Sequence, residues 1–309
     1  MATDPIRQIS MRQMRALAAV AHSRNVTEAA SRLGLTQPAV TLQLKNLEDL
    51  AGLPILQRTP EGMVPTQAGA AILRVHDRVE AALADCINAL DMMKGLTGGR
   101  VSIGAVSTAK YFAPFVIAEF ARQHPAIELK LTIGNREDVL QGLRDYSLDL
   151  AISGRPPADL DLEKRLIGDH PHVVIGPAHH PLASKNHVDL RDLANETFII
   201  REPGSGTRML MEHMLRETGL TPRIGMEISS NETIKQAVMA GLGISFISAH
   251  TVAGEVEDGR LAVLHIEGLP LVRQWFVVRR ADKALLPPAE ALMDFMAAEA
   301  ARFLPVVPG

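Results

Sequence analysis

Apolar positions near the start of the chain follow helical spacing. Those in residues 11–22 recur at i, i+3, i+4 and i+7, as Met14, Leu17, Ala18 and Ala21, which is typical of an amphipathic helix. Two shorter helices follow and meet at Gly34, with Ala30 four residues before it and Val40 six residues after it. A helix-turn-helix needs a small residue where the helices touch, a turn residue that tolerates positive φ and an apolar anchor beneath the second helix. Residues 26–45 therefore predict a helix-turn-helix.

The second helix of this hairpin has two distinct faces. At about 100° per residue, its apolar side chains gather on one face, which should be buried: Val40, Leu44 and Leu47. Thr36 is placed to cap the helix, and Pro38 lies in its first turn, where a missing N–H costs nothing. The outward face mixes polar, cationic and apolar groups, which suits a helix in a DNA major groove; a hairpin with a merely solvated face is the alternative. The candidate DNA-binding residues of the hairpin are Thr27, Gln37, Pro38, Thr41, Leu42 and Lys45.

A short β-hairpin is expected next. Residues 56–66 hold Pro60 and Gly62 between two short extended pieces, which predicts a wing beside the helices. Arg58 lies on this wing and is a candidate contact to a phosphate or to the minor groove. A surface arginine without a nucleic-acid partner is the alternative.

One long helix is predicted from Thr66, its expected N-cap, to about Met93. Its apolar positions recur in alternating steps of three and four: Ile72, Val75, Val79, Ala82, Cys86, Ala89 and Met93. Such a heptad stripe predicts pairing with the same helix of a second subunit, and a helix lying on its own domain is the alternative. Cys86 has no histidine or acidic partner nearby, so we interpret it as a small buried hydrophobe.

The chain changes character after a short hinge, Leu96-Thr-Gly-Gly99. Strand and helix patterns alternate from there to the end, which is typical of a doubly wound α/β sheet. The predicted strands are 101–106, 128–133, 148–153, 173–176, 197–200, 224–228, 244–247 and 274–278. The predicted helices are 114–123, 137–146, one from 207, 232–240 and 288–303.

Composition narrows the class of protein. With 309 residues, 47% of them hydrophobic, the chain suffices for two or three domains with their own cores. The formal net charge of −3 argues against a basic coat, so a DNA-binding protein of this composition would place its positive charge locally. A single cysteine excludes an intramolecular disulfide, the first residues lack the regions of a signal peptide, and no apolar run reaches membrane-spanning length. We therefore expect a cytoplasmic protein without a membrane segment.

The N-terminal stretch carries a family signature. Residues 25–69 contain Ala29-Ala-x-x-Leu-x-Leu-x-Gln-Pro-Ala-Val-Thr and close on Pro65-Thr-Gln-Ala-Gly69, and with them the chain resembles the LysR-type transcriptional regulators over essentially its whole length. The resemblance implies an α/β protein that works as a homotetramer on promoter DNA and recruits RNA polymerase, as an activator, when an inducer binds. Its implied domains are a winged helix-turn-helix (1–65), a linker and dimerisation helix (66–95), and a two-lobed, periplasmic-binding-protein-like effector domain (96–309; lobe I about 100–169 and 272–309, lobe II about 170–271).

The chain departs from the family pattern at the DNA-reading positions. Many members have Ser-Arg where this chain has Thr41-Leu42, phenylalanine at the position of Leu56, and a second basic wing residue around Glu61-Gly62. Losing that basic residue removes a guanine or phosphate contact. Because Leu42 offers methyl groups instead, we expect it to contact a thymine methyl.

Four further stretches resemble the regulators of Calvin-cycle carboxylase (RuBisCO) operons: residues 107–114, 134–137, 201–208 and 230–244. This resemblance implies control of genes for carbon dioxide fixation. The alternatives are a LysR-type regulator of another metabolic operon, with an aromatic or dicarboxylate inducer, and a solute-binding protein for transport, which the helical residues 1–95 disfavour.

The same stretches follow predicted strands, and open α/β sheets bind ligands at the carboxyl ends of their strands and on helix N-termini. Hydroxyls, the backbone N–H groups of the Gly204-Ser-Gly turn and the cations Lys110, Arg136 and Arg201 would meet there, which is chemistry for a phosphate or carboxylate. We expect a small anionic effector, either a phosphorylated sugar-type metabolite or a reduced nucleotide; surface ion pairs are the alternative for each arginine. The candidate effector-binding residues are Ser107, Thr108, Lys110, Asn135, Arg136, Arg201, Glu202, Ser205, Thr207, Asn231 and Glu232.

Catalytic and metal-binding patterns do not stand out. His170, His172, His179 and His180 lie beside prolines in predicted loops, with no cysteine or Glu-x-x-His partner, so no metal is expected. The Gly-Ser-Gly turn lacks the spacing and the following Lys-Ser/Thr of a nucleotide-hydrolysis loop. Without a Ser/His/Asp set, a paired acid or a redox motif, the sequence predicts neither an enzyme nor a cofactor.

Overall fold

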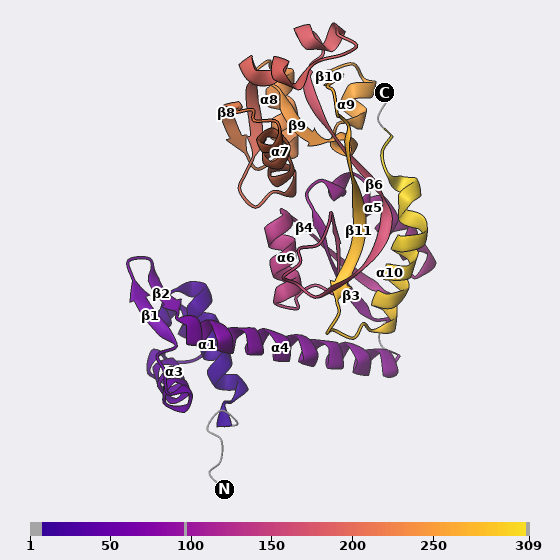
Figure 1. Ribbon diagram of the computed structural model, residues 1–309. Coiled ribbons are helices and arrows are strands. Elements are labelled where there is room, and N and C mark those ends of the chain that lie inside the picture. The colour runs from indigo at the N-terminus through magenta and orange to yellow at the C-terminus, as the bar shows by residue number, and fades with distance from the viewer. Residues whose placement is uncertain (1–7, 96–97, 307–309) are drawn as a thin grey trace. The chain divides into compact units, whose positions relative to one another are not determined.

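The computed structural model describes residues 8–95 and 98–306 (Figure 1). Its contacts divide the chain into two compact units between Ile87 and Asn88, inside the long helix α4 (Gln67–Met93). Part of the expected hinge, residues 96 and 97, lies outside the described residues. Within the described residues, no helix is both long and apolar enough to cross a membrane.

The first unit contains the three predicted helices and the wing. These elements are α1 (Met11–Ser23), α2 (Val26–Leu33), α3 (Gln37–Ala51), β1 (Leu56–Thr59) and β2 (Gly62–Pro65), followed by α4. β1 and β2 pair antiparallel, with Thr59 opposite Gly62. The winged helix-turn-helix that the spacing predicted is therefore confirmed.

The core of this unit confirms one helix face and corrects another. Val40, Leu44 and Leu47 are buried, as the wheel predicted. In α1, however, Ala18 and Ala21 are only half-buried, and Ala16 and Val20 are buried in their place. The reason is that α1 packs against α2, α3 and β2 at once, so its buried face is wider than one amphipathic stripe.

The ends of the helices in the first unit test the predictions for Gly34, Thr66 and Thr36. Gly34 has φ of 64° and donates its N–H to the carbonyls of Ala30 and Ser31, which fits a turn that needs the left-handed region. Thr66 Oγ1 accepts from the Gly69 N–H at 3.1 Å and caps α4 as predicted. Thr36 stands at the N-cap of α3 as predicted, but its side chain makes no capping hydrogen bond. Pro38, at the second helical position, has no N–H to donate to it.

Gly69 explains why the signature ends on glycine. It is buried at the start of α4, and a Cβ there would lie 2.0 Å from the carbonyl oxygen of Ile55. The same oxygen accepts from the Thr66 N–H at 3.0 Å. Only a residue without a side chain allows α4 to begin this close to the strand of the wing.

The second unit is built on a seven-stranded sheet with the strand order β10-β6-β11-β5-β3-β4, and β9 pairs with β6. Here β6 is Leu162–Pro177, β9 is Ser245–Ser248 and β10 is Leu261–Leu264. β3 (Arg100–Val106), β4 (Glu128–Gly134) and β5 (Leu150–Ser153) run parallel, whereas β11 (Leu271–Arg280) is antiparallel to β5. The expected doubly wound pattern therefore holds for the parallel strands, and the sheet as a whole is mixed. The α/β class is confirmed.

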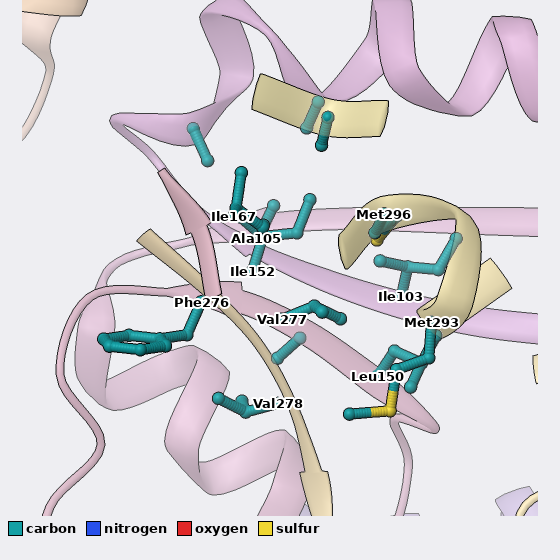
Figure 2. Packing of buried hydrophobic residues seen from close by; sticks show 14 of the residues in the cluster. Ile103, Ala105, Leu150, Ile152, Ile167, Phe276, Val277, Val278, Met293 and Met296 are labelled. Carbon is teal, nitrogen blue, oxygen red and sulfur yellow. The ribbon is translucent and has the colours of Figure 1, made fainter. Parts of the chain in front are cut away.

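The helices α5 (Ala113–Gln123), α6 (Arg136–Arg144) and α10 (Pro287–Glu299, continued by the 3-10 turn Ala300–Phe303) cover the parallel strands. Figure 2 shows Ile103 and Leu150 of these strands beside Met293 and Met296 of α10, within one buried cluster. This cluster is the core of the first lobe.

The second lobe has its own small sheet and two apolar clusters. Its elements are β7 (Thr197–Arg201) and β8 (Arg223–Ile228), which pair parallel, β9 (Ser245–Ser248), β10 (Leu261–Leu264), α7 (Gly206–Glu217), α8 (Asn231–Met239) and α9 (Ala253–Glu257). β10 and α9, which are four and five residues long, were not predicted.

One long strand corrects the sequence reading of the histidines. β6 runs over sixteen residues, Leu162–Pro177, and does not begin at residue 173. His170 and His172 therefore lie in a strand, not in a loop as predicted. The first half of β6 is mostly exposed, so its sequence is polar and shows no apolar run. β6 pairs with β11 from Leu162 to His172 and with β9 and β10 of the second lobe at its end, so β6 runs through both lobes.

Candidate functional sites

The outward face of α3 presents the side chains that the helical wheel placed there. Gln37, Pro38, Thr41, Leu42 and Lys45 are all exposed, and so is Thr27 at the start of α2. Thr27 Oγ1 donates to Gln37 Oε1 at 3.3 Å, and Thr41 Oγ1 donates to the Gln37 carbonyl at 3.0 Å. The first hydrogen bond joins the starts of α2 and α3, so the six candidate residues form one surface.

The wing adds charges of both signs beside this surface. Arg58 on β1 is exposed, and the tip of the hairpin carries Glu61. A hydrogen bond from the Thr59 side chain holds the pKa of the Glu61 carboxyl below its ordinary value, so the tip is negative at neutral pH. The tip therefore carries a carboxylate where the family resemblance led us to expect a second basic residue.

The apolar stripe of α4 is open to solvent in the single chain. Four of the predicted heptad positions are exposed: Val75, Ala82, Cys86 and Met93. Three adjoining side chains that the pattern did not include, Leu83, Ile87 and Leu90, are exposed as well and widen the stripe. Ile72, which the heptad pattern assigned to the stripe, packs on the core of the first unit instead. The prediction that Cys86 is buried is wrong for the single subunit, since the stripe on which it lies is uncovered there.

A cavity of about 990 Å³ opens in the second unit, at the carboxyl ends of the parallel strands. Seven of the candidate effector residues line it: Ser107, Thr108, Asn135, Arg136, Arg201, Ser205 and Thr207. The other four, Lys110, Glu202, Asn231 and Glu232, are not among its lining residues. The structure thus brings one group to the cavity wall and the other to contacts behind or beside it.

Two helices point their N-termini at this cavity. Asn135 caps α6 by accepting from the Asp138 N–H at 2.9 Å, and Ser205 caps α7 by accepting from the Arg208 N–H at 3.4 Å. A Cβ on Gly206, the first residue of α7, would lie 3.3 Å from Cδ of Arg136, so the two helix starts are close together. Helix N-termini stabilise anions through their free N–H groups and dipoles.

Arg201 connects residues of both lobes and has a carboxylate partner within the protein. Its guanidinium is 3% exposed, and it donates to both oxygens of Glu202, at 2.7 and 2.8 Å. It also donates to Asn231 Oδ1 at 2.6 Å and to Ser107 Oγ at 3.1 Å. Since Ser107 follows β3 and Asn231 begins α8, Arg201 joins the two lobes while Glu202 neutralises its charge.

Lys110 takes part in a second bridge between the lobes. Its Nζ lies 3.3 Å from Glu232 Oε1, and the Tyr111 hydroxyl donates to the same carboxylate. Lys235 Nζ reaches the other oxygen of Glu232 at 3.0 Å and Glu255 at 2.9 Å. Burial, together with the bond to Glu232, raises the pKa of the Tyr111 phenol, so this hydroxyl remains a donor. Lys110 thus has a protein carboxylate as its partner.

Several cavity residues were missed by the sequence reasoning. Five cations line the cavity without a carboxylate partner among the described residues: Arg136, which was predicted, and Arg155, Lys164, Arg216 and Arg273, which were not. Only two acidic residues, Asp169 and Glu212, line it. Arg155 could have been found, because it closely follows the predicted strand that ends at Ser153; Lys164 and Arg273 lie on parts of β6 and β11 that were not recognised as strand. The cavity is therefore strongly positive.

Two histidines complete the cavity wall. His170 and His172 are 6% and 3% exposed, and burial lowers the pKa of both imidazoles, that of His172 to about 4. Among the residues that the structure describes, no three histidine, cysteine or acidic side chains are arranged to hold a metal ion.

The two units match two protein families. "Bacterial regulatory helix-turn-helix protein, lysR family" matches residues 11–70, and "LysR substrate binding domain" matches residues 94–301. The chain is 52% identical over 302 residues to the HTH-type transcriptional regulator CbbR of Xanthobacter flavus, covering 97% of this chain and 91% of CbbR. It is 42% identical to the RuBisCO operon transcriptional regulator of Allochromatium vinosum, covering 95% and 97% of the two chains.

Solved structures agree with this pattern. The regulatory domain of CcmR from Synechocystis PCC6803, in complex with 2-phosphoglycolate (2-PG), is 36% identical with a TM-score of 0.63, covering 64% of this chain and 96% of that domain. Full-length CbnR in complex with its target DNA is 22% identical with a TM-score of 0.67, covering 94% and 100%. The second likeness shows that the two chains share their fold.

Proposed function

Since the chain belongs to the LysR family of transcriptional regulators, we propose that it controls genes for carbon dioxide fixation in response to a small phosphorylated anion. The target genes are proposed from its similarity to CbbR and to the RuBisCO operon regulator. The effector class is proposed from one observation above all. Five cations and two helix N-termini face a single cavity, and those cations have no carboxylate partner among the described residues.

In this proposal the exposed face of α3 reads DNA in the major groove, together with Thr27 of α2. Arg58 of the wing contacts the DNA backbone or enters the minor groove. The winged helix-turn-helix would comprise residues 1–65, the linker helix 66–95 and the effector domain 96–309, with lobes near the boundaries that the resemblance implied. We place the protein in the cytoplasm, because its promoter DNA and RNA polymerase are there.

A second copy of the chain is proposed to cover the stripe on α4. Four of its heptad positions and three adjoining apolar side chains are exposed in the single subunit, which is the arrangement of a helix that pairs with its own copy. Two such pairs would give the tetramer that the family resemblance implies. Each pair of α3 helices would then read two related half-sites.

The effector is proposed to bind between the helix starts of α6 and α7, with its oxyanion on Thr108, Asn135, Arg136, Ser205 and Thr207. 2-PG, found with the CcmR domain, combines a phosphate with a carboxylate and suits a cavity with several separate cations. A reduced nucleotide, the other expected effector class, would also use its phosphates here. An aromatic or dicarboxylate inducer would leave more of the cations unsatisfied, so we favour a phosphorylated ligand.

We further propose that the protein is not an enzyme and carries no cofactor. The cavity cations and hydroxyls serve binding, and a regulator needs only a free-energy difference between its ligand-bound and free states. Contacts such as the bridge from Arg201 to Ser107 join the two lobes across the cavity. An anion there would shift the equilibrium between lobe arrangements.

The binding proposal is tested by calorimetry of the full-length protein with 2-PG. We expect Arg136→Ala to weaken binding at least about tenfold, because a charge-assisted hydrogen bond contributes about 1.5–3 kcal/mol. The matched control is Arg191→Ala, an arginine that is exposed and is not part of the cavity wall; it should leave affinity unchanged. Equal affinity of the Arg136→Ala variant and the wild type would contradict the anion cavity.

The DNA proposal is tested by gel shift with promoter DNA. Deleting residues 1–95 should abolish binding, because every proposed DNA contact lies before Arg58 or at it. Promoter binding that survived this deletion would contradict the assignment.

A further inference from the structure

His170 and His172 form an imidazole pair in the cavity wall. The two residues lie on the same face of β6, two positions apart, and their ring centroids are 4.1 Å from each other. Both belong to the lining of the cavity, and both are more than nine-tenths buried. Two titratable groups therefore stand together in a wall that is otherwise dominated by permanent cations.

The surroundings hold this pair rigidly but leave hydrogen-bonding capacity unused. His170 stacks on Trp275, with ring centroids 3.7 Å apart and planes at 16°, and Trp275 Nε1 donates to His250 Nδ1 at 3.1 Å. His172 Nδ1 lies 3.1 Å from the His170 carbonyl oxygen, so this nitrogen carries a proton. His170 Nε2 is buried and has no hydrogen-bond partner among the described residues, which is uncommon for a buried polar atom.

Burial and the charged groups around the pair favour its neutral form in the free protein. Burial is the main cause, and each imidazole also lowers the pKa of its neighbours: His172 and His250 act on His170, and Arg273 of β11, which pairs in register with His170, acts on His172. Asp169 of β6 acts in the opposite direction on His250, whose pKa burial lowers to about 4. The remaining ionisable side chains of the cavity wall are Arg136, Arg155, Lys164, Arg201, Glu212, His213 and Arg216.

We propose that the His170–His172 pair takes up one proton from solvent when an anion enters the cavity, so that anion affinity increases as pH falls. This inference rests on the proposed function, because it describes how the same cavity responds to its effector. An oxyanion favours the charged form of nearby imidazoles and reverses the effect of the cations around them. A second proton is disfavoured, since it would place like charges 4.1 Å apart.

The direction of the pH dependence of anion binding follows from the histidine pKa in the free protein and in the anion complex. A histidine whose pKa is low in the free protein and higher in the complex binds more protons in the complex, so protons and anion strengthen each other's binding. The effect covers the pH range between the two pKa values. Above that range the histidine pair is neutral in both the free protein and the complex. Below that range the pair carries the proton in both.

The experiment is calorimetry of full-length protein with 2-PG at pH 7.0, in buffers with different heats of ionisation. We expect the wild type to take up about 0.5–1 proton per ligand and its affinity to rise about three- to tenfold from pH 8.0 to pH 7.0. In His170→Gln/His172→Gln, which keeps polar side chains that do not titrate, both effects should be lost. The matched control is His187→Gln, an exposed histidine outside the cavity, and it should behave as the wild type.

Each outcome has a definite meaning. Wild-type binding without proton uptake overturns this inference and leaves the proposed function standing, whereas absence of 2-PG binding contradicts the proposed function itself. Uptake that persists in the double variant, or disappears in His213→Gln on α7, also overturns the inference. Because the wild-type measurement needs no substitution, the proposal remains testable even if the double variant fails to fold.

Discussion

Leu42 places a branched apolar side chain on a surface that is mostly polar. It is 54% exposed on α3, between Thr41 and the flanking Lys45 and Pro38. An exposed leucine at this position gains nothing from the protein's own core. A thymine methyl in the major groove is the base group that an apolar side chain recognises, so this residue carries sequence preference rather than general affinity.

We predict that Leu42→Arg changes base preference at one position of each half-site, from thymine toward guanine. A correct base contact contributes about 1–3 kcal/mol of discrimination, so the preference should change about tenfold or more. Gel shifts on operators with single T→C and T→G changes measure it. The control is Leu53→Arg, which adds the same charge at an exposed leucine beyond the end of α3. If Leu42→Arg tightened binding to all sequences equally, the proposed orientation of α3 would be wrong.

Arg201 shows how far residue-level reasoning from sequence can go. Its position after a strand correctly suggested the cavity, and it does line the cavity wall. The sequence could not show that Glu202, its neighbour, accepts two hydrogen bonds from the guanidinium. A side chain's partner depends on rotamers and on groups from distant segments such as Ser107 and Asn231, and these are tertiary facts.

At the scale of elements, α4 both packs into the first unit and exposes an apolar stripe. Its start packs into the first unit through Ile72 and Leu73, and its middle and end expose an apolar stripe. Heptad spacing identified the stripe because periodicity is a local property of the chain. It could not identify where the stripe begins, because that depends on which residues the wing and α1 cover.

We predict that Leu83→Glu weakens self-association at least about tenfold. Leu83 adjoins the heptad positions Ala82 and Cys86 and is 43% exposed in the single chain, and burying a leucine at an interface contributes about 1.5–3 kcal/mol. Sedimentation or light scattering over a range of concentrations measures the change. Ala84→Glu is the matched control, because Ala84 is also exposed but faces away from the stripe. Equal loss in both variants, or in neither, would contradict pairing through this face.

β6 marks the limit of element prediction. Apolar runs located β3 and β5, which are mostly buried, and alternation located β4, whose residues alternate between exposed and half-buried over most of its length. The exposed first half of β6 has no such pattern. Its strand conformation is imposed by pairing with β11, a segment far along the chain.

At the scale of the whole molecule, two polar bridges join the lobes of the effector unit beside the cavity. One is centred on Arg201 and the other on Glu232, which holds Lys110, Tyr111 and Lys235. Burial raises the pKa of the Glu232 carboxyl, but the hydrogen bonds from Tyr111 and Lys235 outweigh burial, and the net pKa is lowered. This carboxylate is therefore ionised at neutral pH.

We predict that Glu232→Gln lowers the thermal unfolding temperature of the full-length protein at pH 7 by about 1–4 °C, since a partly exposed ion pair contributes up to about 1 kcal/mol. A lowered carboxyl pKa stabilises the fold above the unfolded-state pKa, and this contribution is lost as pH falls through the folded-state pKa. The difference from wild type should thus shrink in acid. Glu267→Gln, in an isolated exposed pair with His187, should change little. An unfolding temperature of Glu232→Gln equal to the wild type at pH 7 would show that this bridge adds no stability.

The sequence by itself determined the helix-turn-helix, its buried and outward faces, the wing, the heptad stripe and the strand ends where an anion would bind. These features follow from local periodicity, caps and turn chemistry, and the LysR resemblance that they supported is confirmed. Only the tertiary structure decided which charges face the cavity, which cations are already neutralised and that two histidines share its wall. Those outcomes depend on β6 and β11 pairing across both lobes, and strand pairing between distant segments leaves no local pattern in a polar sequence.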